Sequence, residues 1–354
     1  MNPGSSSLKL RVLEADGRVA VQEDLKALEG KAELDSLESF LARAGELDAA
    51  GVRVVHGGRD FNRSTRVDDR TLDRLEAASE LAPLHNPPAL AAMRGLRRLR
   101  PELPVVACFD TAFHAGLPPE AYTYAVPKEW REWGVRRYGF HGLSHAHAGR
   151  RAAEMTGATR IVSCHLGAGA SLAAVRDGVS VDTTMGFTPM EGLVMATRSG
   201  SLDPGAVLWV QRRRGLGAEA AEQALDRESG LLGLAGTADL KQVLESRAAG
   251  DDDARLGVAV YVHRLRSSIA AMAASLGGLD ALVFTGGVGE HAAPIRAETC
   301  AGLGFLGVVL DEAANRKASA DAEIGAGGSP VHVLVITARE DLEIAREVRN
   351  TLTD

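Results

Sequence analysis

The chain has 354 residues, of which 45% are hydrophobic and 25% are charged, and its formal net charge at pH 7 is −7. This composition is typical of globular proteins, and the length is sufficient for two domains. The densest basic run, residues 212–214, is too short for a nucleic-acid footprint, and no uncharged apolar run approaches the roughly 20 residues of a membrane span. The first fifteen residues include Lys9, Arg11 and Glu14, unlike the apolar segment of a secretory signal. We therefore expect a cytoplasmic protein that binds neither nucleic acid nor membrane.

Short β-rich runs alternate with helical stretches along the chain. The runs expected to form strands are residues 8–13, 53–56, 105–109, 161–165, 281–284 and 331–336. The stretches expected to form helices are residues 68–80, 143–154, 218–226 and 253–276, the last being a long scaffold helix. This alternation predicts an α/β fold. Cys108 and Cys164 lie in two of the apolar runs, which indicates buried, reduced thiols rather than a metal or redox site.

Three clusters of small residues are candidates for phosphate binding: residues 4–9, 167–172 and 286–291. Small residues let backbone N–H groups approach a phosphate closely, so three such clusters favour a nucleotide ligand, although each is also compatible with an ordinary tight turn. The first two clusters both lead into apolar stretches, and this echo suggests a duplicated fold with a ligand between its halves. The third cluster follows a predicted strand and is expected to be a turn before a helix, a natural anion site.

Two familiar motifs do not explain this pattern. The Walker sequence is absent, and the GxGxxG at residues 302–307 precedes a strand-like run instead of following one, so it is expected to be a loop. The nucleophile elbow Gly-x-Ser-x-Gly is absent as well, which argues against an α/β-hydrolase.

Charged and imidazole side chains stand at predicted strand ends or in glycine-rich loops, where ligands of α/β folds bind. They are Arg53, His85, Asp110, His141, Arg198 and Glu340. Pro87 and Pro88 predict a rigid turn after His85, and no structural partner is evident for His141 or Arg198. Loop arginines with acids suited to Mg²⁺ favour phosphoryl transfer to an acceptor that is already ionised. A carboxylic acid meets this condition, because its pKa of about 4 leaves it ionised at pH 7.

Longer segments carry a specific resemblance. They are NPGSSSLKL (2–10), RVVHGGRDF (53–61), LAPLHNPPAL (81–90), CFDTAFH (108–114), RRYGFHGLSH (136–145), residues 165–205, FTGGVGEH (284–291) and VITAREDLEIA (335–345). In these segments, which span nearly the whole chain in order, the sequence resembles the acetate kinase family of the acetate and sugar kinase/Hsp70/actin superfamily. The resemblance implies an α/β fold of two domains with duplicated actin-like ATPase (ribonuclease H-like) topology and an active-site cleft between them. The implied domains are residues 1–113 with 343–354, and residues 114–342.

The resemblance also implies an activity: direct in-line transfer of the γ-phosphoryl group of ATP to acetate, giving acetyl phosphate and ADP, with Mg²⁺ or Mn²⁺ as cofactor, in a homodimer. The implied catalytic residues are Asp110, His141 and Arg198. The implied substrate-binding residues are Arg53, Val55, Leu84, His85, Phe140 and Pro189. The implied nucleotide-binding residues are Ser5, Ser7, Lys9, His165, Gly167, Gly169, Asp239, Gly287, Gly289 and Glu290. The implied metal-binding residues are Asn2 and Glu340.

The chain departs from the family pattern in the nucleotide segments. Ala168 and His291 each stand where the family usually has Asn, and Lys241 stands where Arg is common. These departures concern nucleotide preference more than the reaction. The family also has a strand before the first turn, whereas only Met1 precedes Asn2 here. We therefore expect the natural start to lie upstream, and Asn2 with Pro3 to fray.

Two other functions compete with this interpretation. A kinase for propionate or butyrate is a close alternative: residues 2–5 are reminiscent of butyrate kinases, whereas residues 85–88 and 188–200 favour acetate. A non-catalytic ATP-binding switch of the same superfamily is the alternative from another class. Arg53 and Arg198 argue against the switch, because it needs no carboxylate clamp.

Overall fold

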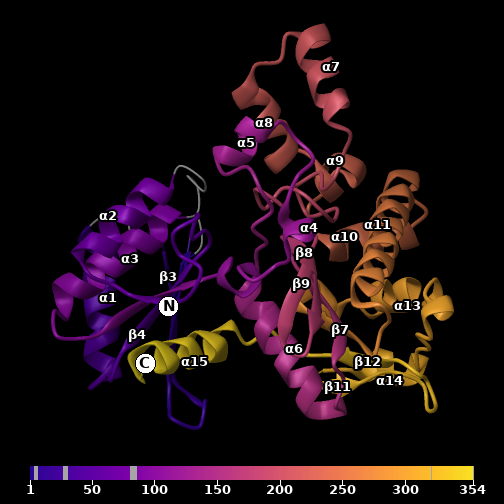
Figure 1. Cartoon of the computed structure of the whole chain (residues 1–354). Helices are drawn as coiled ribbons and strands as arrows, with labels where there is room; N and C mark the ends of the chain where they lie inside the picture. The colour runs from indigo at the N-terminus through magenta and orange to yellow at the C-terminus, as the bar shows by residue number, and fades with distance from the viewer. Residues whose placement is uncertain (4–6, 27–30, 80–85, 320, 354) are drawn as a thin grey trace. The chain divides into compact units, whose positions relative to one another are not determined.

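The computed structural model describes residues 1–3, 7–26, 31–79, 86–319 and 321–353 (Figure 1). The chain divides into two compact units. Unit 1 comprises Met1–Ala115, Phe140–His147 and Arg339–Asp354, and unit 2 comprises Gly116–Gly139 and Ala148–Ala338. These limits differ from the domain limits expected from the sequence by a few residues and by the segment 140–147, so the expected limits stay a prediction. The α/β class is confirmed.

The strands of unit 1 form two three-stranded sheets. They are β1 (Asn2–Pro3), β2 (Ser7–Leu13), β3 (Val19–Lys26), β4 (Ala50–Val54), β5 (Thr65–Arg66) and β6 (Val105–Phe109). The strands β1-β2-β3 are antiparallel, whereas β4 runs parallel to β6, and β5 closes the edge antiparallel to β6. Met1 joins the sheets, because its amino group donates to the Gly51 carbonyl at 2.7 Å and its carbonyl accepts from Arg53 N–H at 3.0 Å. This bonding pattern is that of neighbouring parallel strands.

Unit 2 repeats this order in a six-stranded sheet. Its strands are β7 (Arg160–Leu166), β8 (Ala170–Arg176), β9 (Val179–Thr183), β10 (Ala281–Thr285), β11 (Ala322–Glu323) and β12 (His332–Val335). They lie in the order β11-β12-β10-β7-β8-β9, with β7, β10 and β12 parallel to one another and the other pairs antiparallel. Each unit thus has an antiparallel meander whose first strand neighbours a parallel pair, with a short antiparallel strand at the far edge. The expected duplication of the fold is confirmed.

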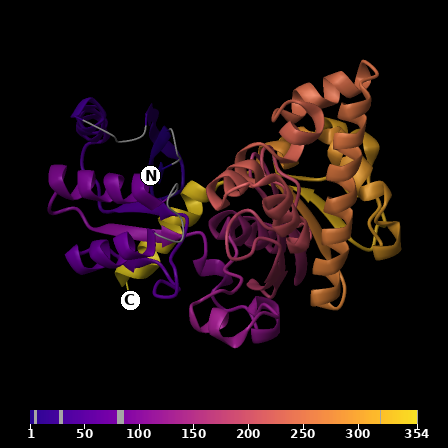
Figure 2. The same cartoon turned by 90° about the horizontal axis from the view of Figure 1, so that it is seen from above.

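Helices of unit 1 pack on both faces of β6, and Figures 1 and 2 show one of them, the yellow C-terminal helix, beside the strands of this unit. Val105, Ala107 and Phe109 pack into the core beneath α1 (Lys31–Ala44), α2 (Asp69–Ala78) and α3 (Asn86–Leu99). Val106 and Cys108 face the opposite way, onto Ile344 and Val348 of α15 (Glu340–Thr353). Burial on both faces is the reason that β6 is a continuous apolar run.

In unit 2, the long helix α11 (Asp252–Leu276) packs against β7, β8 and β9, as the expected scaffold helix should. Gly149 of α6 (Gly142–Thr156) approaches Val175 of β8, so α6 also contacts this sheet. The remaining helices of unit 2 are α4 (Pro119–Tyr122), α5 (Lys128–Glu132), α7 (Pro204–Arg214), α8 (Ala218–Arg227), α9 (Gly230–Ala235), α10 (Leu240–Ala248), α12 (Gly286–His291), α13 (Ala293–Ala301) and α14 (Glu312–Lys317). Short 3₁₀ turns lie at η2 (Ala112–His114) in unit 1 and η3 (Gly304–Leu306) in unit 2.

Several local expectations need correction. Pro87 and Pro88 lie in the first turn of α3 rather than in a rigid turn, because the first helical positions need no backbone N–H. Residues 286–291, expected to be a turn, are themselves the helix α12. Asn2 and Pro3 pair with Lys9 and Leu8, so the expected fraying of these two residues is wrong. No helix in the described part of the chain is long and apolar enough to cross a membrane.

Candidate active site

The first candidate group is a buried ion pair at the ends of two adjacent parallel strands. Arg53 is in β4, and Asp110 directly follows β6. The Asp110 carboxylate accepts from Arg53 Nε at 3.0 Å and from Nη2 at 2.5 Å. Asp110 is fully buried, and the Arg53 side chain is 16% exposed. Because parallel strands end at the same edge of a sheet, their register brings together two residues that are far apart in sequence.

The charges of this pair support each other. Burial raises the pKa of Asp110, and the Arg53 guanidinium opposes that effect. Burial would lower the pKa of Arg53, but the charges of Asp110 and Glu340 outweigh it and raise that pKa. Since arginine keeps its proton in proteins, Asp110 faces a permanent positive charge, which favours its ionised form.

Asn2 extends the pair into a chain of polar contacts. Its side-chain oxygen accepts from Arg53 Nη1 at 3.0 Å, and its Nδ2 donates to Glu340 Oε2 at 2.7 Å. Glu340 is the first residue of α15, where a carboxylate is favoured by the helix dipole. The sequence-predicted residues Asn2, Arg53, Asp110 and Glu340 are therefore brought together, although Asn2 and Glu340 are 338 positions apart. Arg53 keeps a further N–H on each terminal nitrogen with no partner among the described residues.

His141 is attached to this group through its backbone. Its φ angle of 55° is in the left-handed region, which non-glycine residues adopt uncommonly and at an energetic cost. The His141 N–H donates to the Asp110 carboxylate and counteracts the rise in its pKa. The next residue, Gly142, donates its N–H to the Asp110 carbonyl at 2.9 Å. The Tyr-Gly-Phe-His-Gly sequence thus folds as a tight connection into α6 that fixes His141 beside Asp110.

The residues expected to line an apolar pocket in unit 1 are buried. Val55 is 8% exposed and Phe140 is 1% exposed, and the ring of His56 meets the Phe140 ring edge-on with 5.3 Å between centroids. Asn86, at the start of α3, clamps the backbone next to Val55: its side chain accepts from His56 N–H at 3.1 Å and donates to the His56 carbonyl at 2.9 Å. The segment after β4 is therefore held rigidly. Leu84 and His85 lie outside the described residues.

In unit 2, Arg198 has a partner that the sequence did not reveal. Its Nε donates to Asp226 Oδ1 at 2.9 Å, and its Nη1 lies 3.4 Å from the carbonyl oxygen of Pro189. The expectation that Arg198 has no structural partner is therefore wrong, because α8 supplies Asp226. No bond from Nη2 of Arg198 is found within the described ranges.

The loop that carries Pro189 is held by a second polar group. Arg137 donates to the carbonyls of Thr184 and Met185 at 2.9 and 3.0 Å and to Glu191 at 2.8 Å. Tyr124 donates its hydroxyl to Glu191, and burial is the main reason that the pKa of Tyr124 is raised. These contacts give the loop one defined path from β9 to the Arg198 segment.

The turn between β7 and β8 is short and built from small residues. The Gly167 N–H donates to the Gly169 carbonyl at 3.0 Å, directly after His165 and Leu166 of β7. Ala168 is exposed at the tip, and its carbonyl accepts from Ala196 N–H at 3.1 Å. In unit 1, β1 and β2 pair antiparallel as β7 and β8 do; Ser7 and the exposed Lys9 belong to β2, and Ser5 lies outside the described residues.

The glycines of α12 differ in their surroundings. Gly287 is exposed with open space where a Cβ would be, whereas Gly289 packs against the backbone of Phe284. Glu290 Oε1 accepts from the N–H groups of Gly286 at 3.1 Å and Ala338 at 2.9 Å, so this carboxylate ties the start of α12 to the segment after β12. Gly287 is thus the position where a ligand can approach the backbone, and Gly289 and Glu290 shape the helix.

Two more residues complete the nucleotide candidates. Asp239 is the N-cap of α10 and accepts from Lys241 N–H at 2.9 Å, so it has a structural role there. Arg296, which was not predicted, is buried and binds the carbonyls of Gly289 and Glu290 at 2.8 Å each. Its sequence context carries no signal, because its partners, which also include the side chain and carbonyl of Asn315, are brought close only by folding.

Comparisons with known proteins show the family to which the chain belongs. The sequence model of the acetokinase family matches residues 17–346. An acetate kinase from Synechococcus sp. is 49% identical over 319 residues, covering 89% of this chain and 79% of that protein. One from Gloeobacter violaceus is 44% identical over 352 residues, covering 97% and 87%.

Solved structures are similar over the same length. The crystal structure of Porphyromonas gingivalis acetate kinase has a TM-score of 0.91 and 34% identity, covering 99% of this chain and 98% of that one. A propionate kinase from Francisella tularensis has the same TM-score of 0.91, 34% identity and the same coverage. The chain belongs to the acetokinase family.

Proposed function

We propose that this chain is an acetate kinase that transfers the γ-phosphoryl group of ATP to acetate, giving acetyl phosphate and ADP. The observation that carries the proposal is the buried Arg53–Asp110 pair, whose guanidinium keeps N–H groups for an anion. Family membership supports the reaction class. A carboxylate acceptor needs no general base at pH 7, which agrees with a site built from cations and hydrogen-bond donors.

The acceptor would be held from unit 1. The remaining N–H groups of Arg53 suit a planar carboxylate, since a guanidinium presents paired donors in one plane. Val55 and Phe140, with Leu84 and Pro189, would contact the methyl group, and His85 would lie near the carboxylate. Asp110 orients Arg53 and neutralises its charge, so Arg53 can act without leaving an unpaired buried cation.

The transferring phosphoryl group would be held by His141 and Arg198. Catalysis of phosphoryl transfer rests on positioning and on stabilising charge at the equatorial oxygens. The left-handed backbone of His141 and the unused Nη2 of Arg198 support these roles. Arg198→Ala is expected to lower kcat by about 10²-fold or more without unfolding the chain.

The nucleotide would be bound by the small-residue turns and α12. The proposed contacts are Ser5, Ser7 and Lys9 in one turn, His165, Gly167 and Gly169 in the other, and Asp239, Gly287, Gly289 and Glu290 near α10 and α12. The open space at Gly287 supports a backbone contact there. Ala168→Asn should lower the KM for ATP about fivefold, which corresponds to the free energy of one hydrogen bond, about 1 kcal/mol.

Asn2 and Glu340 fit a site for Mg²⁺ or Mn²⁺. Their oxygens are the hard donors that Mg²⁺ prefers, and Mg²⁺ usually takes one or two protein ligands and completes its shell with water and substrate phosphates. When bound, the ion would neutralise charge on the phosphate oxygens. Glu340→Gln should weaken Mn²⁺ binding in a direct titration.

An assay that traps acetyl phosphate as the hydroxamate tests the reaction. The chain is incubated with ATP, Mg²⁺ and acetate, propionate or butyrate in parallel. Acetate should have the highest kcat/KM. Propionate as the best acceptor would favour the alternative that the similarity to the Francisella tularensis propionate kinase keeps open. No product with any acid would refute the proposal and leave the ATP-binding switch.

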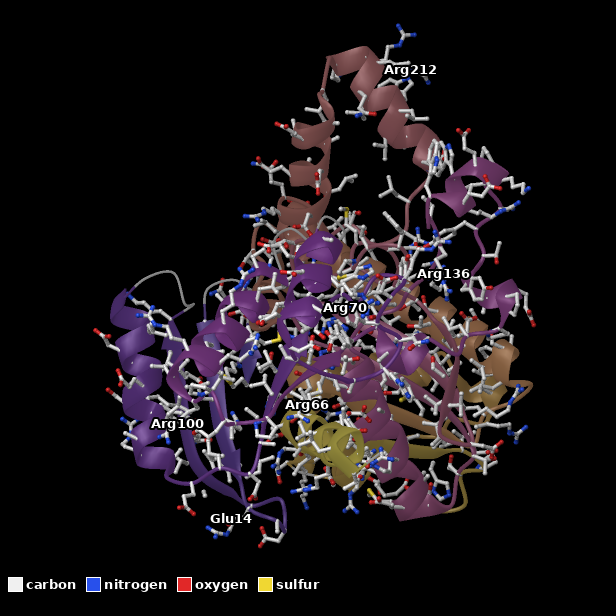
Figure 3. The ribbon with its side chains drawn as sticks, turned by 60° about the vertical axis from the view of Figure 1, so that its left-hand side comes forward. Glu14, Arg66, Arg70, Arg100, Arg136 and Arg212 are labelled. Carbon is white, nitrogen blue, oxygen red and sulfur yellow. The ribbon has the colours of Figure 1, made fainter. Side chains whose placement is uncertain are left out.

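We further propose that the chain forms a homodimer through α7. No residue of this helix is buried, and Leu208 and Trp209 are 53% and 51% exposed; Figure 3 shows Arg212 at its outer end. A second copy of the chain is the proposed occupant of this apolar face. Sedimentation should give the mass of a dimer for the wild type and of a monomer for Leu208→Glu with Trp209→Glu. A monomeric wild type would contradict the proposal.

The cytoplasmic location of the protein, expected from the sequence, stays a prediction.

A further inference from the structure

We propose that Asp226 is the positioning residue of Arg198, and that it does in unit 2 what Asp110 does for Arg53 in unit 1. This inference rests on the proposed function, because Arg198 matters only if it meets the transferring phosphoryl group. It concerns a residue of α8 that no sequence motif identified.

The contact geometry supports this role. Asp226 Oδ1 accepts from Arg198 Nε at 2.9 Å, with the two side chains 21% and 19% exposed. The bond at Nε restricts the orientation of the guanidinium, and no bond from Nη2 of Arg198 is found among the described residues. Arg53 is likewise bonded to an aspartate through Nε, although its Nη2 also donates to Asp110, whereas the Arg198 pair uses Nε alone. Both candidate substrate arginines are therefore bonded to an aspartate through Nε.

The loop that carries Arg198 is anchored independently of the Asp226 carboxylate. The residues on either side of Arg198 are already tied to α8 by bonds that need no Asp226 side chain: Thr197 Oγ1 donates to the Asp226 carbonyl at 2.8 Å, and Ser199 N–H donates to the Leu225 carbonyl at 3.0 Å. Ser229 N–H donates to the Thr197 carbonyl at 2.9 Å. Removing only the carboxylate should thus leave the loop in place and free the guanidinium.

The charge of Asp226 is directed mainly at Arg198. The other cation near it, Arg227, has its Nε 3.9 Å from Oδ2 and is 61% exposed, so solvent weakens that pair. Asp226 keeps Arg198 paired while one edge of the guanidinium stays available. A displacement of about 1 Å in such a group can cost on the order of 10²-fold in rate.

A double-mutant cycle tests the inference. Asp226→Ala should lower kcat for acetyl phosphate formation between about 10- and 100-fold, with the KM for ATP unchanged within about twofold. Asp226→Asn, which keeps an oxygen for the Nε bond, should recover part of the loss. In an Arg198→Ala background, Asp226→Ala should cause no further loss, because Asp226 acts through Arg198. Glu228→Ala is the matched control: this exposed carboxylate bonds Gln223 and should leave kcat unchanged.

An NMR measurement that does not depend on activity tests this inference separately from the proposed function. The Nε–H signal of Arg198 is identified in a ¹⁵N-arginine NMR spectrum by its loss in Arg198→Lys. In the wild type it should exchange slowly with water, and in Asp226→Ala it should exchange quickly. A wild type that makes no acetyl phosphate would refute the proposed function, and this signal would still decide whether Asp226 holds Arg198. Additive losses in the cycle, or an Nε–H signal unchanged by Asp226→Ala, would overturn the inference.

Discussion

The backbone N–H of Gly142 donates to the carbonyl oxygen of Asp110 at 2.9 Å, and a Cβ atom on Gly142 would collide with that same oxygen. The contact joins the start of α6 to the end of β6. Since His141 precedes Gly142 and donates its own N–H to the Asp110 carboxylate, one short segment fixes both the acid and the histidine. The glycine is required here by close packing rather than by its φ angle.

Gly142→Ala is accordingly expected to disturb the site. Overpacking should cost about 1–3 kcal/mol of unfolding free energy. It should also lower kcat more than it raises the KM for acetate, because His141 would move. Gly116→Ala is the control, since nothing lies within 4 Å of its Cβ position. Urea unfolding and the hydroxamate assay check both effects, and normal kcat in Gly142→Ala would contradict the proposed role of His141.

The Arg53–Asp110 pair gives a prediction about stability and activity together. Asp110→Ala leaves a buried guanidinium without its partner and should cost about 3–5 kcal/mol of unfolding free energy, with loss of turnover. Replacing both residues, Arg53→Met with Asp110→Leu, should recover much of the stability because no charge stays buried, yet remain inactive. Measured turnover in the double variant would show that Arg53 does not hold the acceptor.

Val55 is expected to limit the length of the acid. Val55→Ala should raise the propionate-to-acetate ratio of kcat/KM, within the roughly 10–200-fold that one methylene commands in a hydrophobic pocket. Val52→Ala is the matched control, because Val52 lies in β4, shortly before Val55, and belongs to the main core of unit 1. That control should lose stability and keep the ratio. An unchanged ratio in Val55→Ala would mean that another residue limits the pocket.

Asp280 should contribute to the decrease in unfolding free energy at acid pH. The side-chain hydrogen bond from Arg160, with backbone and hydroxyl donors from Thr159 and Arg160, lowers the pKa of Asp280 to about 2. Because the folded pKa is below the unfolded value of about 4, the contribution is fully present above about pH 4 and is lost as the pH falls through about 2. The pair is partly exposed, so we expect a contribution of about 1 kcal/mol.

Unfolding free energies of wild type and Asp280→Asn across the acid range check this. The wild type should be the more stable protein near pH 6, and the difference should shrink below about pH 4. A difference that does not depend on pH would indicate that the amide disrupts packing rather than removing a charge interaction.

The sequence alone determined the elements and the candidate residues wherever the signal was local. Apolar runs placed β6, β7, β10 and β12, and the long periodic helix placed α11, since these follow from hydrophobic periodicity within one segment. The small-residue turns predicted the duplication, and family motifs pointed to Arg53, Asp110 and His141.

Only the tertiary structure decided which side chains act together. Asn2 meets Glu340 across 338 positions, Arg53 meets Asp110 across 57, and Arg198 meets Asp226 across 28. Such pairings depend on strand register and on which helix end reaches which loop, and a period of two or of 3.6 residues carries no information about either. Asp226 and Arg296 therefore stood out only after folding, because their significance lies entirely in what they touch.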